Sequence, residues 1–473
     1  MKSSSLFPLL FIVFTHVLAT WPIINIRRRF KIETDERNIK KLIEALEDDF
    51  THTWMYQDLY STPDQLGVTE ERVEKALSNV GNEQRLNNLL LRALQGEEVK
   101  LVIIGGSISK GAPFSEEGKG NMVYFNAIED WWNKVIGSVT QSSMSSDSIA
   151  IGGVGTDYFS YCLHTHLEED NKAKLILWEL SANDRGRYDS APFPPGQPLE
   201  QFTRNVLTRV SKPTLMYIHF FRGQDYMGGQ CKNCEDEGGD TIASHYNITS
   251  LSWRNFVRDS MVAKEPLFLE KSIFADDKLH PSILGHAQMA YLIINHLKKT
   301  FLKFLKQSAL DITRKSKQGV VNEDDIDLPD IMYQDTSAGK PLCFTYFKYN
   351  SNEPKESLLV EYKKQDGYRF NIFKQFKIRE DKLGGMQTKL AQKELQVAFD
   401  LPTNYSKLAI ITHGGTGGAQ ISLDRFTPVL VETDNYTMGT KLQVIRKDLK
   451  TGKHVLNVKS MNNGFALCGI AVI

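Results

Sequence analysis

The stretch of residues 101–111 constrains the fold of this chain more than any other. It opens with four consecutive apolar residues, three of them β-branched, which predict a strand buried on both faces as in a parallel sheet. Gly105 and Gly106 then allow a sharp turn ahead of Ser107. Because α/β folds bind ligands outside the carboxyl ends of their strands, Ser107 is a candidate nucleophile. A Gly-Gly-Ser step is also an ordinary turn, so this interpretation depends on the rest of the chain.

Predicted strands and helices alternate after this stretch. Strands are predicted at residues 174–180 and 214–221, with helical patterns between them and a long helix after residue 282. Such alternation predicts a parallel sheet covered by helices on both faces. Ahead of it, residues 21–99 carry amphipathic helical patterns and are interpreted as a helical prefix.

The sequence changes character after this domain. Residues 308–340 are acidic and weakly hydrophobic, which predicts a linker. From residue 341 to residue 473, short strands alternate with glycine-containing turns. This pattern is typical of an antiparallel β-sandwich.

The N-terminus indicates entry into the secretory pathway. Lys2, a short apolar run over residues 6–13 and small residues near Ala19 predict a signal peptide over residues 1–20. An uncut anchor, with the arginines at 27–29 on the cytoplasmic side, is the alternative. Sequons at Asn247, Asn404 and Asn435 agree with a secreted or luminal glycoprotein. We expect no stable membrane insertion.

The overall charge excludes some classes of partner. The chain has 57 basic and 57 acidic residues, so its formal net charge is zero. Such a balance does not favour binding to nucleic acid or to an anionic membrane surface.

Five cysteines predict disulfides rather than a metal site. Cys231 and Cys234 have a metal-ligand spacing, but the chain lacks a second ligand pair for them. In an oxidising compartment they are expected to bond to each other, or one of them to Cys162. Cys343 and Cys468 bracket the C-terminal region, and a bond between them would tie its first strand to its last. One cysteine stays unassigned.

Asp277 and His280 form a second motif that carries chemistry. Pro281 follows His280 and precedes a predicted helix, so the imidazole is expected at a loop–helix junction. A carboxylate three residues earlier reaches the distal imidazole nitrogen and steadies the imidazolium that forms during catalysis. By themselves, these residues also fit a helix cap beside a surface histidine. Combined with Ser107, they predict a Ser-His-Asp nucleophile site.

Four blocks of the chain resemble those of the SGNH (GDSL-type) hydrolase superfamily. In chain order they are Gly105-Gly106-Ser107-Ile108, Gly152 to Gly155, Ser181-Ala182-Asn183-Asp184, and Asp277-Lys278-Leu279-His280-Pro281. The resemblance covers residues 100–306. It implies a flavodoxin-like three-layer α/β/α hydrolase domain with a parallel sheet at residues 100–307, followed here by the all-β sandwich domain.

The resemblance also implies a role for each site residue. Ser107 is the expected nucleophile, His280 the general base, and Asp277 the residue that orients the base. The Asn183 amide and the backbone N–H groups of Ser107 and Gly155 are the expected oxyanion donors. No cofactor and no metal is implied.

Two residues depart from the family pattern. The first block commonly has Asp before the nucleophile, where this chain has Gly106, and the third commonly has Gly where this chain has Ser181. Neither departure removes a catalytic group. The second block holds several glycines, so Gly153 is the alternative to Gly155 as a donor.

The expected activity is that of a secreted serine esterase acting on carboxylic esters. Acetyl esters on glycans are the leading substrate class because a β-domain is attached, which is an argument by association. A lipid or small-ester esterase and a glycan O-acyltransferase would use the same residues. A catalytically idle glycan-binding or matrix protein is the alternative from another class, and Gly106 and Ser181 are its only support. No feature of the sequence indicates an oligomeric state.

Overall fold

A computed structural model gives the fold over most of the chain. It describes residues 36–47, 55–114, 121–167, 172–185, 196–229, 238–315, 327–334, 336, 341–346, 360–372, 384–433, 439–461 and 464–473. The predicted signal peptide, Asn435, Cys231 and Cys234 lie outside these ranges. Within them, no helix combines the length and the apolar character needed to cross a membrane.

The first domain is built on one six-stranded sheet in the order β1-β6-β5-β4-β2-β3. Its strands are β1 (Leu77–Asn79), β2 (Val99–Gly105), β3 (Met144–Ala150), β4 (Ala173–Glu179), β5 (Thr214–His219) and β6 (Thr249–Ser252). All neighbours pair in parallel except β1, which runs antiparallel to β6 at the edge. If the parallel strands β2 to β6 are numbered 1 to 5 along the chain, their order across the sheet, read from β3, is 2-1-3-4-5. This is the strand order of flavodoxin-like folds. The predicted fold class is therefore confirmed, with one antiparallel strand added.

The central strand β2 shows why this sequence forms a doubly covered sheet. Its apolar residues are fully buried, and successive side chains point to opposite faces of the sheet. Leu101 and Ile103 belong to one hydrophobic core, and Val102 and Ile104 belong to the other. An unbroken apolar run is thus what a strand between two helical layers requires.

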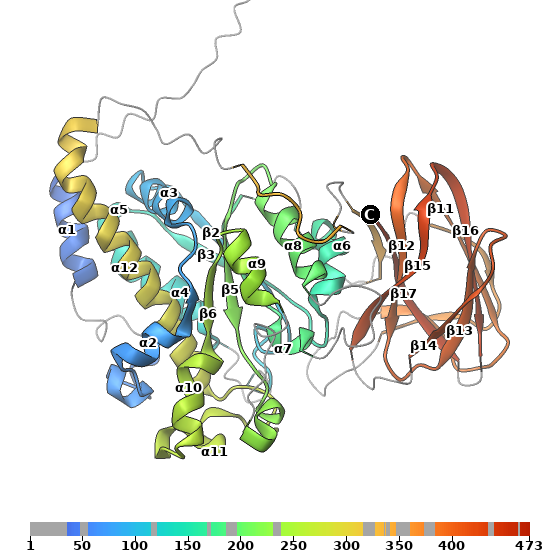
Figure 1. The fold of residues 1–473 in the computed structure, drawn as a ribbon, viewed down its shortest axis with the longest axis horizontal. Coiled ribbons are helices and arrows are strands. Elements are labelled where there is room, and N and C mark those ends of the chain that lie inside the picture. The colour runs from blue at the N-terminus through green and yellow to red at the C-terminus, as the bar shows by residue number, and fades with distance from the viewer. Residues whose placement is uncertain are drawn as a thin grey trace, which may run out of the picture.

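Helices form a layer on each face of the sheet (Figure 1). The layer on the Leu101 side contains mainly α1 (Glu36–Glu47), α2 (Glu70–Ala76), α3 (Glu83–Leu94), α4 (Tyr124–Trp131), α10 (Trp253–Val262) and the long α12 (Ile283–Lys315). The layer on the other side contains α6 (Thr156–His166), α8 (Gln197–Leu207) and α9 (Gly239–His245). Shorter helices are α5 (Gly137–Thr140), α7 (Ser181–Asp184) and α11 (Glu270–Ile273).

The second domain is an antiparallel β-sandwich, as predicted. One sheet has the order β15-β12-β17-β10-β9 with β7 beside β17, and the other has the order β14-β13-β16-β11-β8. The strands are β7 (Leu342–Thr345), β8 (Glu361–Gln365), β9 (Arg369–Ile372), β10 (Gly384–Thr388), β11 (Glu394–Leu401), β12 (Tyr405–His413), β13 (Gly418–Leu423), β14 (Val429–Glu432), β15 (Thr440–Leu449), β16 (Gly452–Ser460) and β17 (Phe465–Val472). A separate hydrophobic core fills the space between the sheets.

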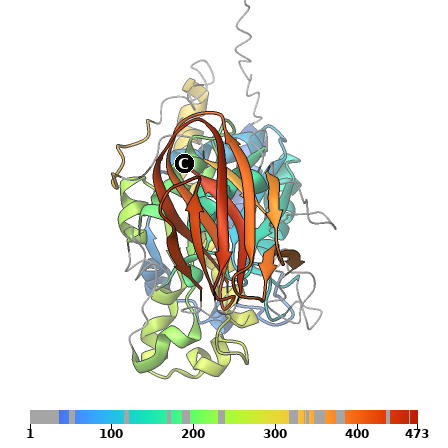
Figure 2. The same ribbon diagram turned by 90° about the vertical axis from the view of Figure 1, so that its right-hand side faces the viewer.

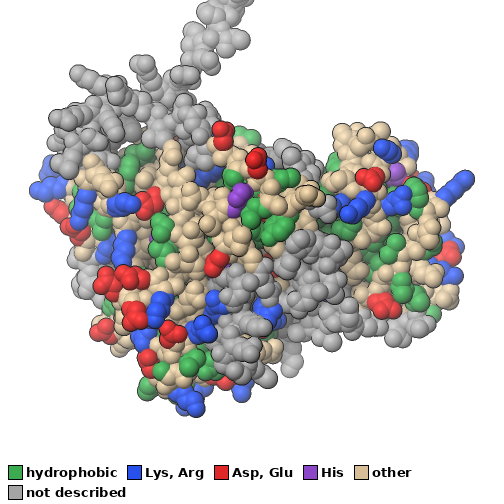
Figure 3. Space-filling view, in the orientation of Figure 1, with side chains coloured by type: hydrophobic (Ala, Val, Ile, Leu, Met, Phe, Trp, Pro, Cys, Tyr) green, Lys and Arg blue, Asp and Glu red, His purple; other side chains and the backbone are tan. Residues whose placement is uncertain are grey.

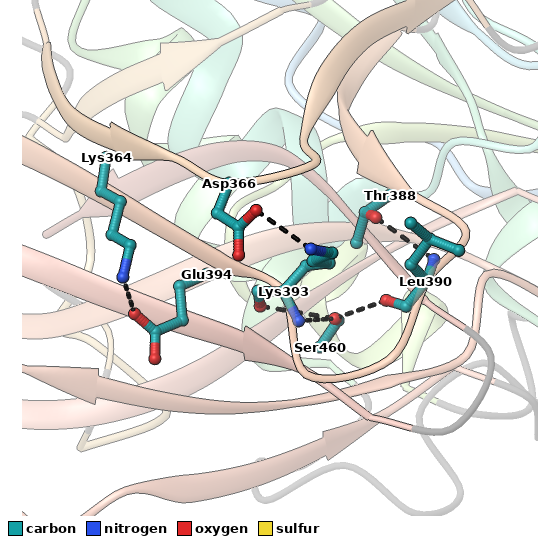
Figure 4. A network of polar contacts seen from close by, with 7 residues as sticks. All are labelled: Lys364, Asp366, Thr388, Leu390, Lys393, Glu394 and Ser460. Carbon is teal, nitrogen blue, oxygen red and sulfur yellow. Dashed lines mark hydrogen bonds and ion pairs between the residues drawn. The ribbon is translucent and has the colours of Figure 1, made fainter.

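The turn from β10 to β11 carries the chain from one sheet to the other and is held by a buried serine (Figure 4). Ser460 Oγ donates to the Leu390 carbonyl at 2.7 Å and accepts from the Lys393 N–H at 2.9 Å. The surrounding ion pairs, such as Lys393–Asp366 at 3.1 Å, are partly exposed. Exposed pairs of this kind contribute little to stability, so the turn is held mainly by hydrogen bonds, those of the buried serine and those of the backbone, such as the Gln392 N–H to the Ser460 carbonyl at 2.9 Å.

The sandwich packs directly on α6 of the first domain (Figures 1 and 2). The outer face of its first sheet shares a hydrophobic core with Tyr158, Phe159 and Leu163 of α6. The sandwich contributes Cys343, Ala409, Ile411, Leu442, Ala466, Cys468, Ala471 and Ile473 to this core. Burying one Ile or Leu side chain stabilises by about 2 kcal/mol, so this shared core joins the domains firmly.

A disulfide reinforces the junction and corrects the predicted pairing. Cys343 of β7 is bonded to Cys162 of α6, and Cys468 is a buried free cysteine. The predicted bond between Cys343 and Cys468 is therefore wrong, as is the alternative pairing of Cys162. Cys343 of β7 lies opposite Ala471 of β17, and Cys468 lies three residues before Ala471. At about 3.3 Å per residue, these three residues span about 10 Å along the strand. Cysteines whose Cα atoms lie more than about 7 Å apart cannot be bridged.

Candidate active site

Ser107 lies on a tight turn directly after β2. A Cβ on Gly105 would lie only 2.4 Å from Ser109 Oγ, so this position has no room for a side chain. At Gly106 a Cβ would lie 2.4 Å from Asn183 Nδ2. The departure from the family pattern at Gly106 thus has a structural reason, because the Asn183 amide occupies the space a larger residue would need. Ser107 itself is 9% exposed, in line with a nucleophile at the base of a site.

His280 and Asp277 approach Ser107 from the loop before α12. Ser107 Oγ lies 2.7 Å from His280 Nε2, and His280 Nδ1 lies 2.6 Å from Asp277 Oδ2. The loop is closed by a hydrogen bond from the Ala275 N–H to the His280 carbonyl at 2.9 Å. Ser107 and His280 are 173 positions apart in the chain, and with Asp277 they form one continuous hydrogen-bond chain.

Asp277 is held in its ionised form. Its Oδ1 accepts from the backbone N–H groups of Leu279 at 2.9 Å and His280 at 3.0 Å. Burial alone would raise the pKa of this carboxyl, but these hydrogen bonds and that from the His280 ring lower the pKa to about 2. A carboxylate in this state fixes the proton of a neutral imidazole on Nδ1 and leaves Nε2 free to accept a proton from Ser107.

The predicted oxyanion donors besides Ser107 lie on two neighbouring segments. Gly155 is the residue directly before α6, and Asn183 lies in the short helix α7 after β4. Asn183 Nδ2 donates to the carbonyl of Val154 at 2.6 Å, which places the amide beside Gly155. Within the described part of the chain, the N–H groups of Ser107 and Gly155 meet no acceptor. The carbonyl of Gly153, the alternative donor residue, accepts from Thr440 of the sandwich at 3.2 Å.

The position of these loops follows from the sheet order. Strands β2 and β4 are neighbours, and the chain leaves them toward opposite edges of the sheet. Their carboxyl ends therefore flank a topological switch point, where open α/β sheets form binding crevices. Ser107 follows β2 and Asn183 follows β4, so both lie at this point.

One buried residue of the site was missed by the sequence analysis. Glu179, the last residue of β4, accepts hydrogen bonds from Ser109 Oγ at 2.7 Å, the Ser109 N–H at 3.2 Å and the Gly106 N–H at 3.4 Å. Tyr124 Oη lies 3.0 Å from the same Ser109 Oγ. Burial raises the pKa of Glu179 to about 7, although these hydrogen bonds act to lower it. The only signal in the sequence was a charged residue at the end of an apolar strand.

The remaining predicted sites are placed only in part. Asn247 and Asn404 are exposed, whereas Thr249 of the first sequon is buried. Asn435 lies outside the described residues. Over the described ranges, His, Cys, Asp and Glu side chains form no group of three or more that could hold a metal ion.

Comparison with known proteins identifies the fold. No family model matches the chain, and no match was found among curated proteins. The chain is similar to two crystal structures of a two-domain esterase active on acetylated mannans, one of them co-crystallised with mannopentaose. Each is 19% identical and covers 84% of this chain and 97% of the other, with TM-scores of 0.59 with mannopentaose and 0.61 without it.

Similarity at this identity shows a shared fold over both domains, and the function must be argued from the site. The chain therefore shares the two-domain fold of these structures, and the predicted arrangement of an α/β domain followed by a β-sandwich is confirmed.

Proposed function

We propose that this protein is a secreted serine esterase of SGNH type that hydrolyses carboxylic esters, with acetyl esters on glycans as its substrates. The observation that carries the proposal is the hydrogen-bond chain from Ser107 Oγ through His280 to Asp277, with distances of 2.7 and 2.6 Å. A general base must lie within hydrogen-bond reach of the proton it removes, and this one does.

In the proposed reaction, Ser107 Oγ attacks the carbonyl carbon of the ester while His280 Nε2 takes the hydroxyl proton. The tetrahedral intermediate then collapses, and His280 returns the proton to the leaving sugar hydroxyl. Water attacks the resulting acyl-serine with His280 again as the base, which releases the carboxylic acid and restores Ser107. Asp277 stays ionised throughout and stabilises the imidazolium.

The negative charge of the intermediate needs hydrogen-bond donors in fixed positions. The Asn183 amide and the N–H groups of Ser107 and Gly155 are the proposed donors. Removing one such donor costs about 3 kcal/mol of transition-state stabilisation in comparable acyl-transfer sites. Asn183 keeps one amide hydrogen for this purpose, since the other is donated to Val154.

The substrate class is supported by the shared two-domain fold. The two-domain esterase is active on acetylated mannans, and this chain shares its fold over 84% of its length. A charged polymer is a less suitable substrate, because the chain is neutral overall and basic and acidic side chains are interspersed on the face in Figure 3. We therefore place neutral acetylated polysaccharides first.

The proposal is tested on the full-length protein with two measurements. Labelling with an alkyl fluorophosphonate, followed by mass mapping, should give an adduct on Ser107 and none in Ser107→Ala. Acetate release should be measured from 4-nitrophenyl acetate and from acetylated mannan. Ser107→Ala should release acetate from neither substrate while keeping the wild-type circular dichroism. A folded wild type that neither binds the probe nor releases acetate would refute the esterase assignment and favour a binding protein.

A further inference from the structure

The sandwich domain contacts the loop that carries Gly155. This loop, residues 151–155, leads from β3 into α6. The Thr440 N–H donates to the Gly153 carbonyl at 3.2 Å, and the Leu442 N–H donates to Asp157 Oδ2 at 2.9 Å. Both donors belong to β15 of the sandwich, so one strand of the second domain contacts the chain on both sides of Gly155.

The approach of the two backbones is closest at Gly439. This residue has a φ of +87°, and a Cβ on it would lie 2.3 Å from the Gly153 carbonyl oxygen. The Gly439 carbonyl in turn accepts from the Gly414 N–H at 2.9 Å, which fixes it to the end of β12. Any side chain at residue 439 would therefore push against the Gly153 carbonyl rather than move away from it.

The first domain also holds this loop, through residues of α7. Asp184 Oδ1 accepts from the Thr156 N–H at 2.8 Å, and Asn183 Nδ2 donates to the Val154 carbonyl at 2.6 Å. Asp184 is buried, and the Thr156 hydroxyl is also hydrogen-bonded to it. α7 thus fixes the two residues next to Gly155, Val154 and Thr156, and the sandwich fixes Gly153 and Asp157, which lie one position farther out.

Further contacts keep α6 and the sandwich in one relative position. The disulfide joins Cys162 of α6 to Cys343 of β7, and Tyr158 Oη donates to Thr345 Oγ1 of the same strand at 3.3 Å. Together with the shared apolar core, these contacts make the sandwich a fixed support for the start of α6.

The geometry points to a catalytic role for the sandwich that is separate from any binding of glycan: the segment Gly439–Leu442 positions the Gly155 N–H for the oxyanion. This inference rests on the proposed esterase function. Gly439 and Asp157 are positioning residues, since they act through the loop and do not touch the reacting atoms. A displacement of about 1 Å in a catalytic group is enough to lower the rate about 100-fold, so a small push on this loop should be measurable.

The test compares two glycine variants of the full-length protein. Gly439→Ala places a methyl group against Gly153 of the first domain. Gly464→Ala is the matched control, because Gly464 has a φ of +86° and its Cβ would lie 2.1 Å from the carbonyl of Thr388, in its own domain. Both changes strain the sandwich to a similar degree, and only the first one pushes on the loop of Gly155.

The substrate for this test is 4-nitrophenyl acetate, which is too small to need a glycan-binding surface. We expect Gly439→Ala to lower kcat about 10- to 100-fold with KM within about twofold of wild type. Gly464→Ala should keep the wild-type kcat. Equal kcat values in the two variants would overturn the inference. If the wild type is active in the same assay, the proposed function is unaffected by that result. Inactive wild-type protein would instead overturn the proposed function.

A second pair of variants covers the case in which Gly439→Ala fails to fold. Asp157→Ala removes the acceptor of the Leu442 N–H, and Asp157→Asn keeps an oxygen at the same place. We expect kcat to fall about tenfold or more in Asp157→Ala and to recover most of this loss in Asp157→Asn, again with little change in KM. Wild-type kcat in a folded Asp157→Ala protein would contradict a positioning role for the sandwich.

Discussion

Glu179 should make the stability of the first domain depend on pH in a way that one substitution removes. Burial raises the pKa of this carboxyl from its ordinary value of 4.5 to about 7, and the nearby Asp184 charge adds to the rise. The unfolded chain releases the proton near pH 4.5, whereas the folded protein keeps it until about pH 7. The stabilising contribution is therefore fully present below pH 4.5 and is lost as the pH rises through 7.

The size of the effect follows from the two pKa values. At about 1.4 kcal/mol per pH unit, the difference between 4.5 and about 7 corresponds to about 3 kcal/mol. Glu179→Gln stays uncharged at every pH and keeps an oxygen to accept from Ser109 and Gly106. The free energy of unfolding of the variant, relative to wild type, should therefore increase by about 3 kcal/mol between pH 4.5 and pH 8.

Urea unfolding followed by tryptophan fluorescence measures this difference. All six tryptophans precede residue 308, and the four that the structure describes are buried in the first domain: Trp131, Trp132, Trp178 and Trp253. Their emission therefore reports the unfolding of this domain, and Trp178 directly precedes Glu179 in the chain. The matched control is Glu74→Gln on the exposed side of α2, which should leave the free energy of unfolding close to that of wild type because the side chain is in water. A difference between Glu179→Gln and wild type that stays constant from pH 4.5 to pH 8 would show that Glu179 is ionised in the folded protein, and the reasoning would fail.

Three further predictions concern the site and the domain junction. Asp277→Asn should lower kcat by about 10⁴ with the fold intact, because the amide no longer stabilises the His280 imidazolium; a loss below tenfold in an acetate-release assay would be inconsistent with this role. Gly106→Ala should displace the Asn183 amide, because Nδ2 of Asn183 would lie only 2.4 Å from the added carbon, and should lower kcat about 100-fold. Unchanged kinetics would show that the Asn183 amide does not need the space at Gly106. Cys162→Ser should destabilise the protein by about 2 to 5 kcal/mol in thermal unfolding, since the bond closes a loop with a sequence separation of 181 residues, and an unchanged melting temperature would speak against it.

The sequence predicted the parts of the fold that depend on local patterns. The apolar run of β2 is buried on both faces because each residue of that run meets one of the two helical layers. The order of short motifs along the chain also identified Ser107, Asn183 and His280 as candidate site residues. Ser107 and Asn183 follow the ends of β2 and β4, and parallel strands bring their carboxyl ends to one edge of the sheet, so the proximity of these two residues could be inferred without coordinates. His280 instead lies in the loop between α11 and α12, and its approach to Ser107 was expected only from the resemblance between motifs.

Only the tertiary structure decided which surfaces of the two domains meet. An alternating strand pattern shows that β7 has two faces, but it does not tell which face turns toward α6. For that reason the bond between Cys162 and Cys343 was not predicted from the chain.

The same limit applies to Glu179 and to Gly439. Each acts through a backbone contact with a segment distant in the chain, and such contacts depend on how elements are packed rather than on the residue types nearby. The sequence by itself therefore determined the fold class and the candidate catalytic residues. Tertiary packing determined which residues support that site. Packing within the first domain places Glu179 against the turn of Ser107, and packing between the domains places the second domain against the loop of the proposed oxyanion donor.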